Sequence, residues 1–444
     1  MKEFGEMNIL VIGAGYVGLT TAVVLSQKHN VVLVEANRKR LELIERGKAP
    51  FYENDLESFL RASIEQGRIK PAPWDMISES YDYIIICVGT PSKDGGKVDL
   101  EQLDASIIKI DEVFDRINDD YLVVALRSTV PPGTTKAHIL DVLSRNHHPR
   151  SFGVVFNPEF LRQGRALADI MQPDRVVIGA SNSRALQAYR MLYSTILQNG
   201  NTPIFEMSIE SAELCKYASN AFLSMKISFT NEISSIAERM PTVSIDNVLT
   251  GMIADHRICA SHLKPGLGFG GACLPKDLAG LTAFGMGLGL PMELMNAVRI
   301  VNDQVIGRLF GKLKRHVNRI DGKKIAILGL AFKPGTDDIR GSQSIDLITY
   351  LLRENAEVWA HDPMVRVDSI PLNISQLFTR ADDVLECVRG AEAVVVMTKW
   401  PEYCQIGIDK IAAELATKVI VDGVGVFANS VIPNGVDYVR LGAY

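Results

Sequence analysis

The sequence is poor in cysteine, carries no strong excess of charge and has no long apolar run. Six cysteines are scattered without the paired spacing of a zinc site, at positions 87, 215, 259, 273, 387 and 404. We interpret them as free thiols of a reducing cytoplasm, with no bound metal. A net charge of −5 gives no electrostatic reason to expect a nucleic-acid partner. Without a membrane-length apolar run or a secretory signal in the polar first residues, we expect no membrane association.

The length and composition of the chain are those of a globular protein with several domains. The chain has 444 residues, of which 47% are hydrophobic and 22% charged. Such values are ordinary for folded proteins, and the length predicts two or three domains.

The first strong pattern is a glycine turn between two apolar runs. Residues 7–12 are a short β-branched run, and Gly13, Gly15 and Gly18 follow it at the spacing of a dinucleotide fingerprint. A helical pattern then runs from Leu19, and the strand after it ends at Glu35. The glycines allow a tight turn and close approach of a pyrophosphate, while an acid at position 35 suits the ribose diol of NAD and repels the 2′-phosphate of NADP. The alternative is a tight strand–helix turn without a ligand.

Further apolar runs predict more buried strands in the first domain. They cover residues 83–88, 122–126 and 153–157, and polar residues follow each of them. Ligands of such sheets bind beyond the carboxyl ends of the strands, so Thr129 and Glu159 would face a ligand. For Thr129, a hydroxyl that only stabilises a turn is an equally good interpretation.

A long helix is predicted from residue 209 to about 240. Lys216 and Asn220 are four residues apart and therefore share a face of this helix. They are either part of a solvated stripe or a cation and an amide that stabilise a developing oxyanion. Further helices are predicted to about residue 317, and Arg257 lies in a loop where a surface arginine is the default.

At residue 323 the strand–helix pattern starts again. Residues 324–328 and 357–360 predict strands, and Lys333 follows the first of them. Lys333 is either a solvated lysine or a cation that meets a diphosphate. We therefore predict an α/β protein with two Rossmann-like domains joined by a long central helix, divided at 1–205, 206–317 and 318–444.

A cysteine in a glycine-rich turn completes the pattern. Residues 268–277 read GFGGACLPKD, with Cys273 followed by Lys276 and Asp277. A thiol reacts as thiolate and needs a polarising neighbour, which these two residues could help to supply. A lone cysteine is more often a small buried apolar residue.

Taken together, these motifs resemble the UDP-glucose/GDP-mannose dehydrogenase family, and within it the UDP-glucose 6-dehydrogenases. The resemblance rests on six stretches across nearly the whole chain, at residues 13–18, 128–133, 157–162, 213–220, 268–277 and 329–340. It implies oxidation of a nucleotide sugar at C6 with two NAD, and a homodimer or higher oligomer formed through the long helix. The aldehyde would be captured by Cys273 as a thiohemiacetal, then oxidised to a thioester and hydrolysed.

The resemblance also assigns roles to individual residues. The implied catalytic residues are Cys273, Lys216, Asn220, Asp277, Glu159 and Thr129. The implied NAD-binding residues are Gly13, Gly15, Tyr16, Val17, Gly18, Glu35, Thr90, Thr129 and Lys276. The implied substrate-binding residues are Glu159, Phe160, Leu161, Lys216, Asn220, Arg257, Phe269, Gly270, Lys333 and Arg340, with Arg257 reaching the sugar of the other subunit.

Two positions depart from the family pattern. Gln163 stands where the family usually has a second glutamate, and Val424 stands where it usually has an arginine that helps to hold the nucleotide. Three hypotheses follow: a UDP-glucose 6-dehydrogenase, a dehydrogenase of another nucleotide sugar such as GDP-mannose or a UDP-N-acetylhexosamine, and a catalytically weakened regulatory protein that binds NAD and nucleotides.

Overall fold

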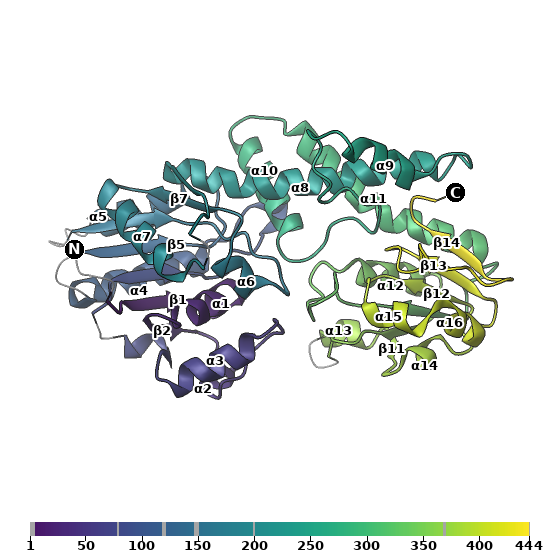
Figure 1. The fold of residues 1–444 in the computed structure, drawn as a ribbon, viewed down its shortest axis with the longest axis horizontal. Coiled ribbons are helices and arrows are strands. Elements are labelled where there is room, and N and C mark those ends of the chain that lie inside the picture. Colours follow the sequence, from purple (N-terminus) through teal and green to yellow (C-terminus); the bar gives the residue numbers. More distant parts are fainter. Residues whose placement is uncertain are drawn as a thin grey trace. The chain divides into compact units, whose positions relative to one another are not determined.

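The computed structural model describes residues 5–77, 80–117, 121–145, 151–198, 200–366 and 370–443. The chain forms two compact units, each built on one sheet with helices on its faces (Figure 1). Unit 1 comprises Met1–Ser219 and Ala279–Gly287, and unit 2 comprises Asn220–Leu278 and Leu288–Tyr444. The predicted division into three domains stays a prediction.

Unit 1 contains an eight-stranded sheet in the order β3-β2-β1-β4-β5-β6-β7-β8. Neighbouring strands are parallel except β6 and β7, which are antiparallel. The order of connection reverses between β1 and β4, so the ligand crevice of this sheet is expected there. The strands are β1 (Asn8–Ile12), β2 (Asn30–Val34), β3 (Ile69–Ala72), β4 (Tyr83–Ile86), β5 (Leu122–Leu126), β6 (Phe152–Phe156), β7 (Val176–Ala180) and β8 (Ile204–Met207).

The central strands are continuous apolar runs because both faces of the sheet are buried. Side chains alternate between the faces, so that Val11 belongs to one apolar cluster while Leu10 and Ile12 belong to the other. Helices cover these clusters: α1 (Tyr16–Leu25), α2 (Arg38–Glu45), α3 (Leu56–Glu65), α4 (Glu101–Ile117), α5 (Asp141–Arg145), α6 (Ala166–Met171) and α7 (Ser183–Ile196).

Unit 2 contains a six-stranded, fully parallel sheet in the order β11-β10-β9-β12-β13-β14. This is the strand order of the first six strands of unit 1, with the reversal between β9 and β12. The strands are β9 (Lys324–Leu328), β10 (Glu357–His361), β11 (Thr379–Arg380), β12 (Ala393–Val396), β13 (Val419–Asp422) and β14 (Asp437–Arg440). The helices of this sheet are α12 (Gln343–Arg353), α13 (Leu372–Ser375), α14 (Val384–Val388), α15 (Pro401–Ile406) and α16 (Ile408–Glu414). The expected α/β class with two Rossmann-like sheets is confirmed.

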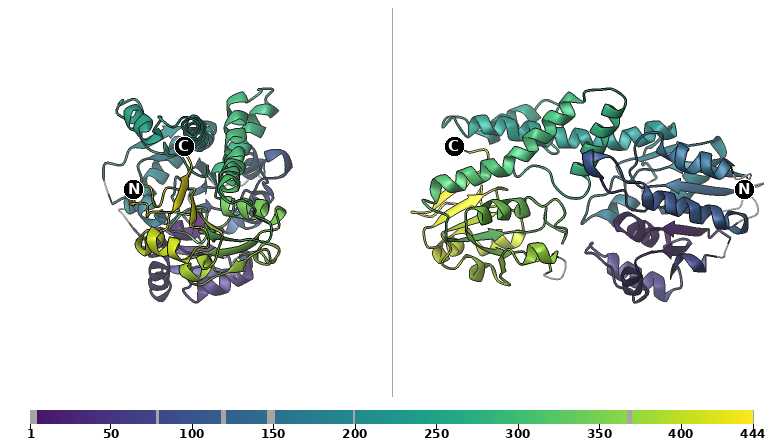
Figure 2. Two further views of the ribbon diagram at one scale, coloured as in Figure 1. Left: turned by 90° about the vertical axis from the view of Figure 1, so that its right-hand side faces the viewer. Right: turned by 180° about the vertical axis from the view of Figure 1, so that it is seen from behind.

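Four helices occupy the middle of the chain, and Figure 2 gives two further views of them. They are α8 (Ile209–Ala237), α9 (Ile245–Ile253), α10 (Leu274–Gly287) and α11 (Glu293–His316). The long helix predicted from residue 209 is α8, with 29 residues, and it ends at Ala237 rather than near residue 240. The helix predicted from Leu19 begins earlier, at Tyr16.

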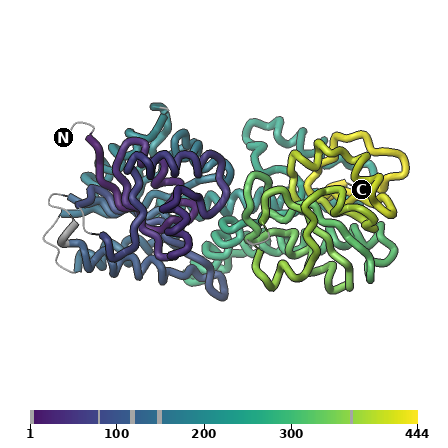
Figure 3. Tube along the Cα trace, turned by 90° about the horizontal axis from the view of Figure 1, so that it is seen from below, coloured from purple at the N-terminus to yellow at the C-terminus, as the bar shows by residue number. Residues whose placement is uncertain are grey.

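The chain end is fixed to the helices of unit 2. The Lys312 ammonium on α11 donates a hydrogen bond to the Ala443 carbonyl at 2.7 Å, and the Gly442 N–H donates to Glu238 just beyond α8, also at 2.7 Å. Figure 3 follows this part of the chain in yellow.

Candidate functional site

The glycine turn of unit 1 is shaped by contacts that no larger residue could make. Gly13 has φ +92°, and a Cβ on Gly18 would lie 1.8 Å from the Gly13 carbonyl oxygen. A Cβ on Gly15 would meet nothing within 4 Å. Gly15 precedes α1, and no side chain caps the start of this helix in the described part of unit 1. Backbone N–H groups at this helix start therefore suit the pyrophosphate of a dinucleotide.

Glu35 stands at the end of β2, beside this turn. Its buried carboxylate accepts hydrogen bonds from the Ala14 N–H at 3.1 Å and the Asn37 N–H at 2.7 Å. A carboxylate can accept about four hydrogen bonds. Two acceptor positions therefore suit a ribose diol, so the predicted NAD site fits the residues present.

Tyr16 connects the glycine turn to a loop far along the chain. Its hydroxyl donates a hydrogen bond to Glu53, which also accepts from the Gly164 N–H at 2.6 Å and the Ala166 N–H at 2.9 Å. Burial, with the neighbouring Glu53 carboxylate, raises the pKa of Tyr16, so the phenol stays protonated. Glu53 was not predicted, because a carboxylate in a loop carries no local signal that two of its partners, Gly164 and Ala166, lie more than a hundred residues away.

The ends of β4 and β5 are joined by short polar contacts. The Thr90 hydroxyl donates to the Thr129 carbonyl at 2.8 Å, and the Ser128 hydroxyl donates to the Val88 carbonyl at 2.7 Å. These two loops border the crevice between β1 and β4, where the sheet order reverses. Val17 lies in the same region, in the first turn of α1.

A buried ion pair joins the end of β6 to α8. The Lys216 ammonium lies 3.1 Å from a Glu159 carboxylate oxygen and donates to the Glu159 carbonyl at 2.7 Å. The other carboxylate oxygen accepts from the Leu161 N–H at 2.6 Å, and Lys216 lies over the Phe160 ring, 5.2 Å from its centroid. Burial opposes ionisation, but the Lys216 charge and the Leu161 N–H outweigh it and lower the pKa of Glu159.

The second predicted pair on the long helix belongs to unit 2. The Asn220 amide donates to an Asp277 carboxylate oxygen at 2.6 Å, and the other oxygen lies 2.7 Å from the Lys276 ammonium. Both Asn220 and Asp277 are buried. Asp277 therefore has an amide donor on one oxygen and a cation on the other, an arrangement suited to holding a proton or a water molecule.

Cys273 is exposed and directly precedes α10. The Asp277 N–H donates to the Cys273 carbonyl at 2.8 Å, which is the first hydrogen bond of the helix, so Cys273 occupies its N-terminal cap. The partial positive charge of a helix N-terminus favours a thiolate there. This placement removes the interpretation of Cys273 as a buried apolar residue.

The glycines before Cys273 pack against the start of the second sheet domain. A Cβ on Gly270 would lie 2.3 Å from the Gly341 carbonyl oxygen, and one on Gly271 would lie 2.7 Å from the Phe332 ring. The Phe269 N–H donates to the Asn302 side chain at 2.7 Å, which fixes the turn to α11. Asn302 was not predicted, since an asparagine within a helical pattern carries no local signal.

The loop after β9 carries two predicted substrate residues of unit 2. Arg340 forms a bidentate pair with Asp338, with contacts of 2.9 and 2.7 Å, and the Lys333 ammonium lies 5.7 Å from the Phe332 ring centroid. Val424, after β13, packs against the apolar core of the sheet. Position 424 therefore adds no charge to the mouth of this sheet.

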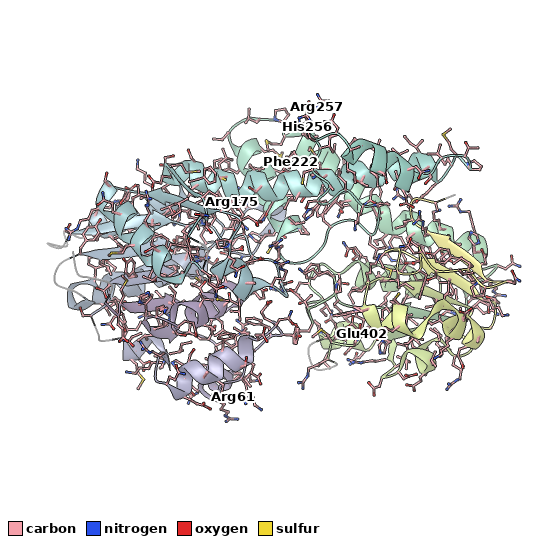
Figure 4. All side chains as sticks on the ribbon, in the orientation of Figure 1. Arg61, Arg175, Phe222, His256, Arg257 and Glu402 are labelled. Atoms are coloured by element: carbon pink, nitrogen blue, oxygen red, sulfur yellow. The ribbon has the colours of Figure 1, made fainter. Side chains whose placement is uncertain are left out.

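Arg257 lies at the surface (Figure 4). Its side chain is 79% exposed and pairs with Asp255 at 2.5 Å. It borders an apolar pocket of about 490 Å³ between α8, α9 and α11, to which Phe222, Phe229 and Leu294 contribute.

Within unit 1 the structure thus brings Glu159, Phe160 and Leu161 together with Lys216, and the glycine turn together with Glu35. Within unit 2 it brings Asn220, Lys276 and Asp277 together. Among the described residues no cluster of three or more His, Cys, Asp or Glu side chains could hold a metal ion. No helix in the described ranges combines the length and apolarity that a membrane crossing requires.

Comparison with known proteins extends over nearly the whole chain. Three domains of the UDP-glucose/GDP-mannose dehydrogenase family match it: the NAD binding domain at residues 7–198, the central domain at 210–304 and the UDP binding domain at 326–429. A UDP-glucose 6-dehydrogenase of Bacillus subtilis is 35% identical over 98% of both chains, and one of Pseudomonas aeruginosa is 35% identical over 95% of this chain and 94% of its own.

Solved structures of similar fold are also nucleotide-sugar dehydrogenases by name. A UDP-glucose dehydrogenase of Pyrobaculum islandicum has a TM-score of 0.90 and 32% identity, covering 100% of this chain and 99% of its own. A UDP-D-ManNAc dehydrogenase of Pyrococcus horikoshii has a TM-score of 0.86 and 26% identity, over 98% and 99% of the two chains. The matched NAD binding domain agrees with the fit of the glycine turn and Glu35, and NAD is the cofactor. The chain belongs to the UDP-glucose/GDP-mannose dehydrogenase family.

Proposed function

We propose that the protein oxidises UDP-glucose to UDP-glucuronate in two successive two-electron steps. The observation that carries the proposal is the start of α10, where the Cys273 thiol occupies the helix cap and Asp277, one turn later, is held by Asn220. A nucleophile and a proton-handling acid on one helix end suit the capture of an aldehyde. The names of the similar curated proteins support UDP-glucose as the substrate.

In the proposed reaction, two molecules of NAD would each accept one of the two hydrides that leave C6. The Cys273 sulfur forms a bond to the aldehyde carbon, giving a thiohemiacetal that cannot diffuse away. After loss of the second hydride it becomes a thioester. Water then adds to the thioester carbonyl, the carbon–sulfur bond breaks, and the carboxylate and the thiol are released.

Charged and polar neighbours support these steps. We assign Lys216 and Asn220 to the oxygen that gains negative charge, because an ammonium and an amide N–H stabilise an oxyanion. Asp277 and Thr129 are assigned to proton transfer through a water molecule, and Glu159 to activation of the hydrolytic water. Glu159 fits a base, since the contacts that lower its pKa keep it ionised.

We assign most of the cofactor-binding residues to the first domain, and the residues for the nucleotide sugar to all three domains. The NAD-binding set extends from Gly13, Gly15, Tyr16, Val17, Gly18 and Glu35 to Thr90 and Lys276. For the nucleotide sugar we propose Phe160, Leu161, Phe269, Gly270, Lys333 and Arg340. The match of residues 326–429 to a UDP binding domain supports this assignment. We keep the predicted division at 1–205, 206–317 and 318–444 as part of the proposal.

A different nucleotide sugar is the second candidate, for which Val424 is the reason. Its apolar side chain packs on the core and provides no cation at the sheet mouth. Similar structures include a dehydrogenase named for UDP-D-ManNAc. An N-acetylated UDP-sugar is therefore the first alternative to UDP-glucose.

We also propose a homodimer in the cytoplasm. The apolar side chains of Phe222, Phe229 and Leu294 are 57%, 43% and 57% exposed, and exposed apolar groups of this kind often mark protein interfaces. In such a dimer, Arg257 would act in the partner's substrate site. Light scattering combined with size exclusion measures the mass, and a monomer would contradict the proposal.

The decisive experiment measures NADH formed per UDP-glucose consumed, with analysis of the sugar product. A ratio of two with UDP-glucuronate as product supports the complete proposal. A ratio of one would mean that the aldehyde is released and that Cys273 is not a working nucleophile. If no NADH forms, the same assay with UDP-N-acetylhexosamines and GDP-mannose tests the alternatives.

A further inference from the structure

A buried guanidinium lies behind the Glu159–Lys216 pair. Arg127 directly follows β5 and is only 4% exposed. It donates to the Asn157 side-chain oxygen at 2.7 Å and to the Tyr193 hydroxyl at 2.5 Å. Neither of these partners is a carboxylate. In the described part of the chain, the Arg127 Nε atom has no hydrogen-bond partner.

Asn157 is the centre of this arrangement. Its side-chain oxygen also accepts from the Tyr193 hydroxyl at 2.6 Å and the Tyr189 hydroxyl at 3.2 Å, and its amide donates to the Val177 carbonyl at 2.8 Å. Asn157 precedes Glu159 by two residues. The network of Arg127 therefore fixes the point at which the loop carrying Glu159 leaves β6.

Arg127 and Glu159 also line one small pocket. Its volume of about 40 Å³ is enough for a single water molecule, and Phe160, Pro173 and Tyr193 also line it. Burying a guanidinium is unfavourable unless a carboxylate lies near. Glu159 is such a carboxylate, and the Arg127 charge is among the causes that lower its pKa, after burial and the contacts of Lys216 and Leu161.

Other charged groups of the pocket are matched by their own contacts. Arg162 pairs with Asp169 at 2.6 Å, so the two add little net charge. Arg175 lies over the Phe160 ring, 3.8 Å from its centroid, and its neighbour Asp174 also lines the pocket.

Two further titratable groups near Glu159 are neutral. Burial raises the pKa of the Cys87 thiol to about 12, and burial with Glu53 raises the pKa of Tyr16. The positive charges of Lys216 and Arg127 both lower the pKa of Glu159, and these three groups together carry a net charge of +1. A site with this charge is prepared for an additional negative charge, such as a developing oxyanion.

We propose that Arg127 is a positioning residue for Glu159: it fixes the Glu159 loop through Asn157, and it places a second buried positive charge in the pocket that Glu159 lines. The role in the reaction rests on the proposed function of Glu159 as the base of thioester hydrolysis. The coupling between the two residues does not, because it is a property of the protein without substrate.

The test is a titration of Glu159 by 13C NMR in protein labelled at the glutamate carboxyl carbons, with the signal identified by its loss in Glu159→Gln. In Arg127→Gln the midpoint should rise by about one pH unit, since loss of a nearby opposite charge disfavours the carboxylate. In Arg127→Lys it should change much less. Arg184→Gln, which removes an exposed arginine from α7, is the control and should leave it unchanged.

If Arg127→Gln does not fold, Asn157→Asp is used in its place. This variant keeps Arg127 and gives it a second carboxylate partner, which competes with Glu159 for its charge. A Glu159 midpoint that stays constant in the folded charge variant overturns the proposal. In the charge variant, the pH below which thioester hydrolysis slows should rise by the same amount as the titration midpoint of Glu159. If the wild-type protein does not oxidise UDP-glucose, the proposed function fails, while the titration still decides the coupling.

Discussion

The two sheets of this protein share a strand order but differ in the turns at their mouths. In unit 1, the turn at residues 13–18 carries three glycines and leads directly into α1. In unit 2, the same spacing after β9 carries Gly329, Ala331 and Pro334, and the next helix begins only at Gln343. Proline has no N–H to offer a phosphate, and no helix starts at this turn. The second sheet therefore lacks the dinucleotide cradle of the first.

The acids that end the second strands differ in the same way. Glu35 accepts two backbone hydrogen bonds, from the Ala14 and Asn37 N–H groups. Asp362, after β10, accepts five: from four backbone N–H groups at 2.7–3.0 Å and from the Trp400 indole at 3.1 Å. Asp362 is therefore saturated by its own unit, whereas Glu35 keeps acceptor capacity for a ligand. Strand order alone does not determine the ligand, because the turn residues decide which groups a ligand can reach.

The largest effect on activity is expected from Cys273→Ala. This variant tests whether a residue of unit 2 carries the covalent chemistry while unit 1 binds the cofactor. Without the thiol no thioester forms, so we expect formation of carboxylate to fall by about 10⁴-fold or more. NAD affinity should stay at the wild-type value. Product analysis measures the formation of carboxylate, and a calorimetric titration measures the NAD affinity. Full activity of the variant would exclude the covalent mechanism.

Gly18→Ala should follow, with a loss of NAD affinity of about 100-fold or more. The added Cβ would lie 1.8 Å from the Gly13 carbonyl oxygen, so the turn that receives the pyrophosphate must move. Binding of UDP, which we assign to unit 2, should not change.

Gly251→Ala is the matched control for this change. Gly251 lies within α9, and a Cβ there would meet nothing within 4 Å. The substitution should leave NAD affinity unchanged and should stabilise the helix by up to about 1 kcal/mol. Wild-type NAD affinity in Gly18→Ala would show that the turn does not hold the cofactor.

Asp362→Asn should lower the stability of unit 2 and leave ligand binding by unit 1 unchanged. The amide replaces an acceptor by a donor that faces backbone N–H groups, so we expect the free energy of unfolding to fall by about 3 kcal/mol. NAD affinity should be unaffected. Denaturant unfolding measures the effect, and Asp382→Asn, at a position 96% exposed, is the control. A stable variant with weakened substrate binding would instead make Asp362 a ligand-binding residue.

Much of this comparison could be predicted from the sequence, because the deciding residues are close together along the chain. The turn at 13–18, the turn before Cys273 and the central apolar strands are all local patterns. The edge strands β3 and β8 were not predicted, since they are short, partly exposed and lack an apolar run. Glu53 and Asn302 were not predicted either, because their partners come from distant parts of the chain.

The smallest effect, and the sharpest test of the comparison, is expected from Glu35→Gln. The glutamine oxygen can still accept one backbone hydrogen bond, but the charge that favours a ribose diol is lost. We expect NAD affinity to fall by about tenfold, which corresponds to one charge-assisted hydrogen bond of about 1.4 kcal/mol. The fold of unit 1 should remain intact, in contrast to the effect of Asp362→Asn on unit 2. Calorimetric titration with NAD, together with denaturant unfolding, measures both quantities.

The same variant should also change the choice of cofactor. Arg40 lies 3.9 Å from the Glu35 carboxylate and is half exposed. Once the carboxylate is replaced by a neutral amide, Arg40 can pair with the 2′-phosphate of NADP, and the carboxylate no longer repels this phosphate. The ratio of NADP to NAD affinity should therefore rise, whereas Glu42→Gln, which removes an exposed carboxylate from α2, should leave it unchanged. An unchanged ratio in Glu35→Gln would mean that Glu35, like Asp362, serves only its own unit.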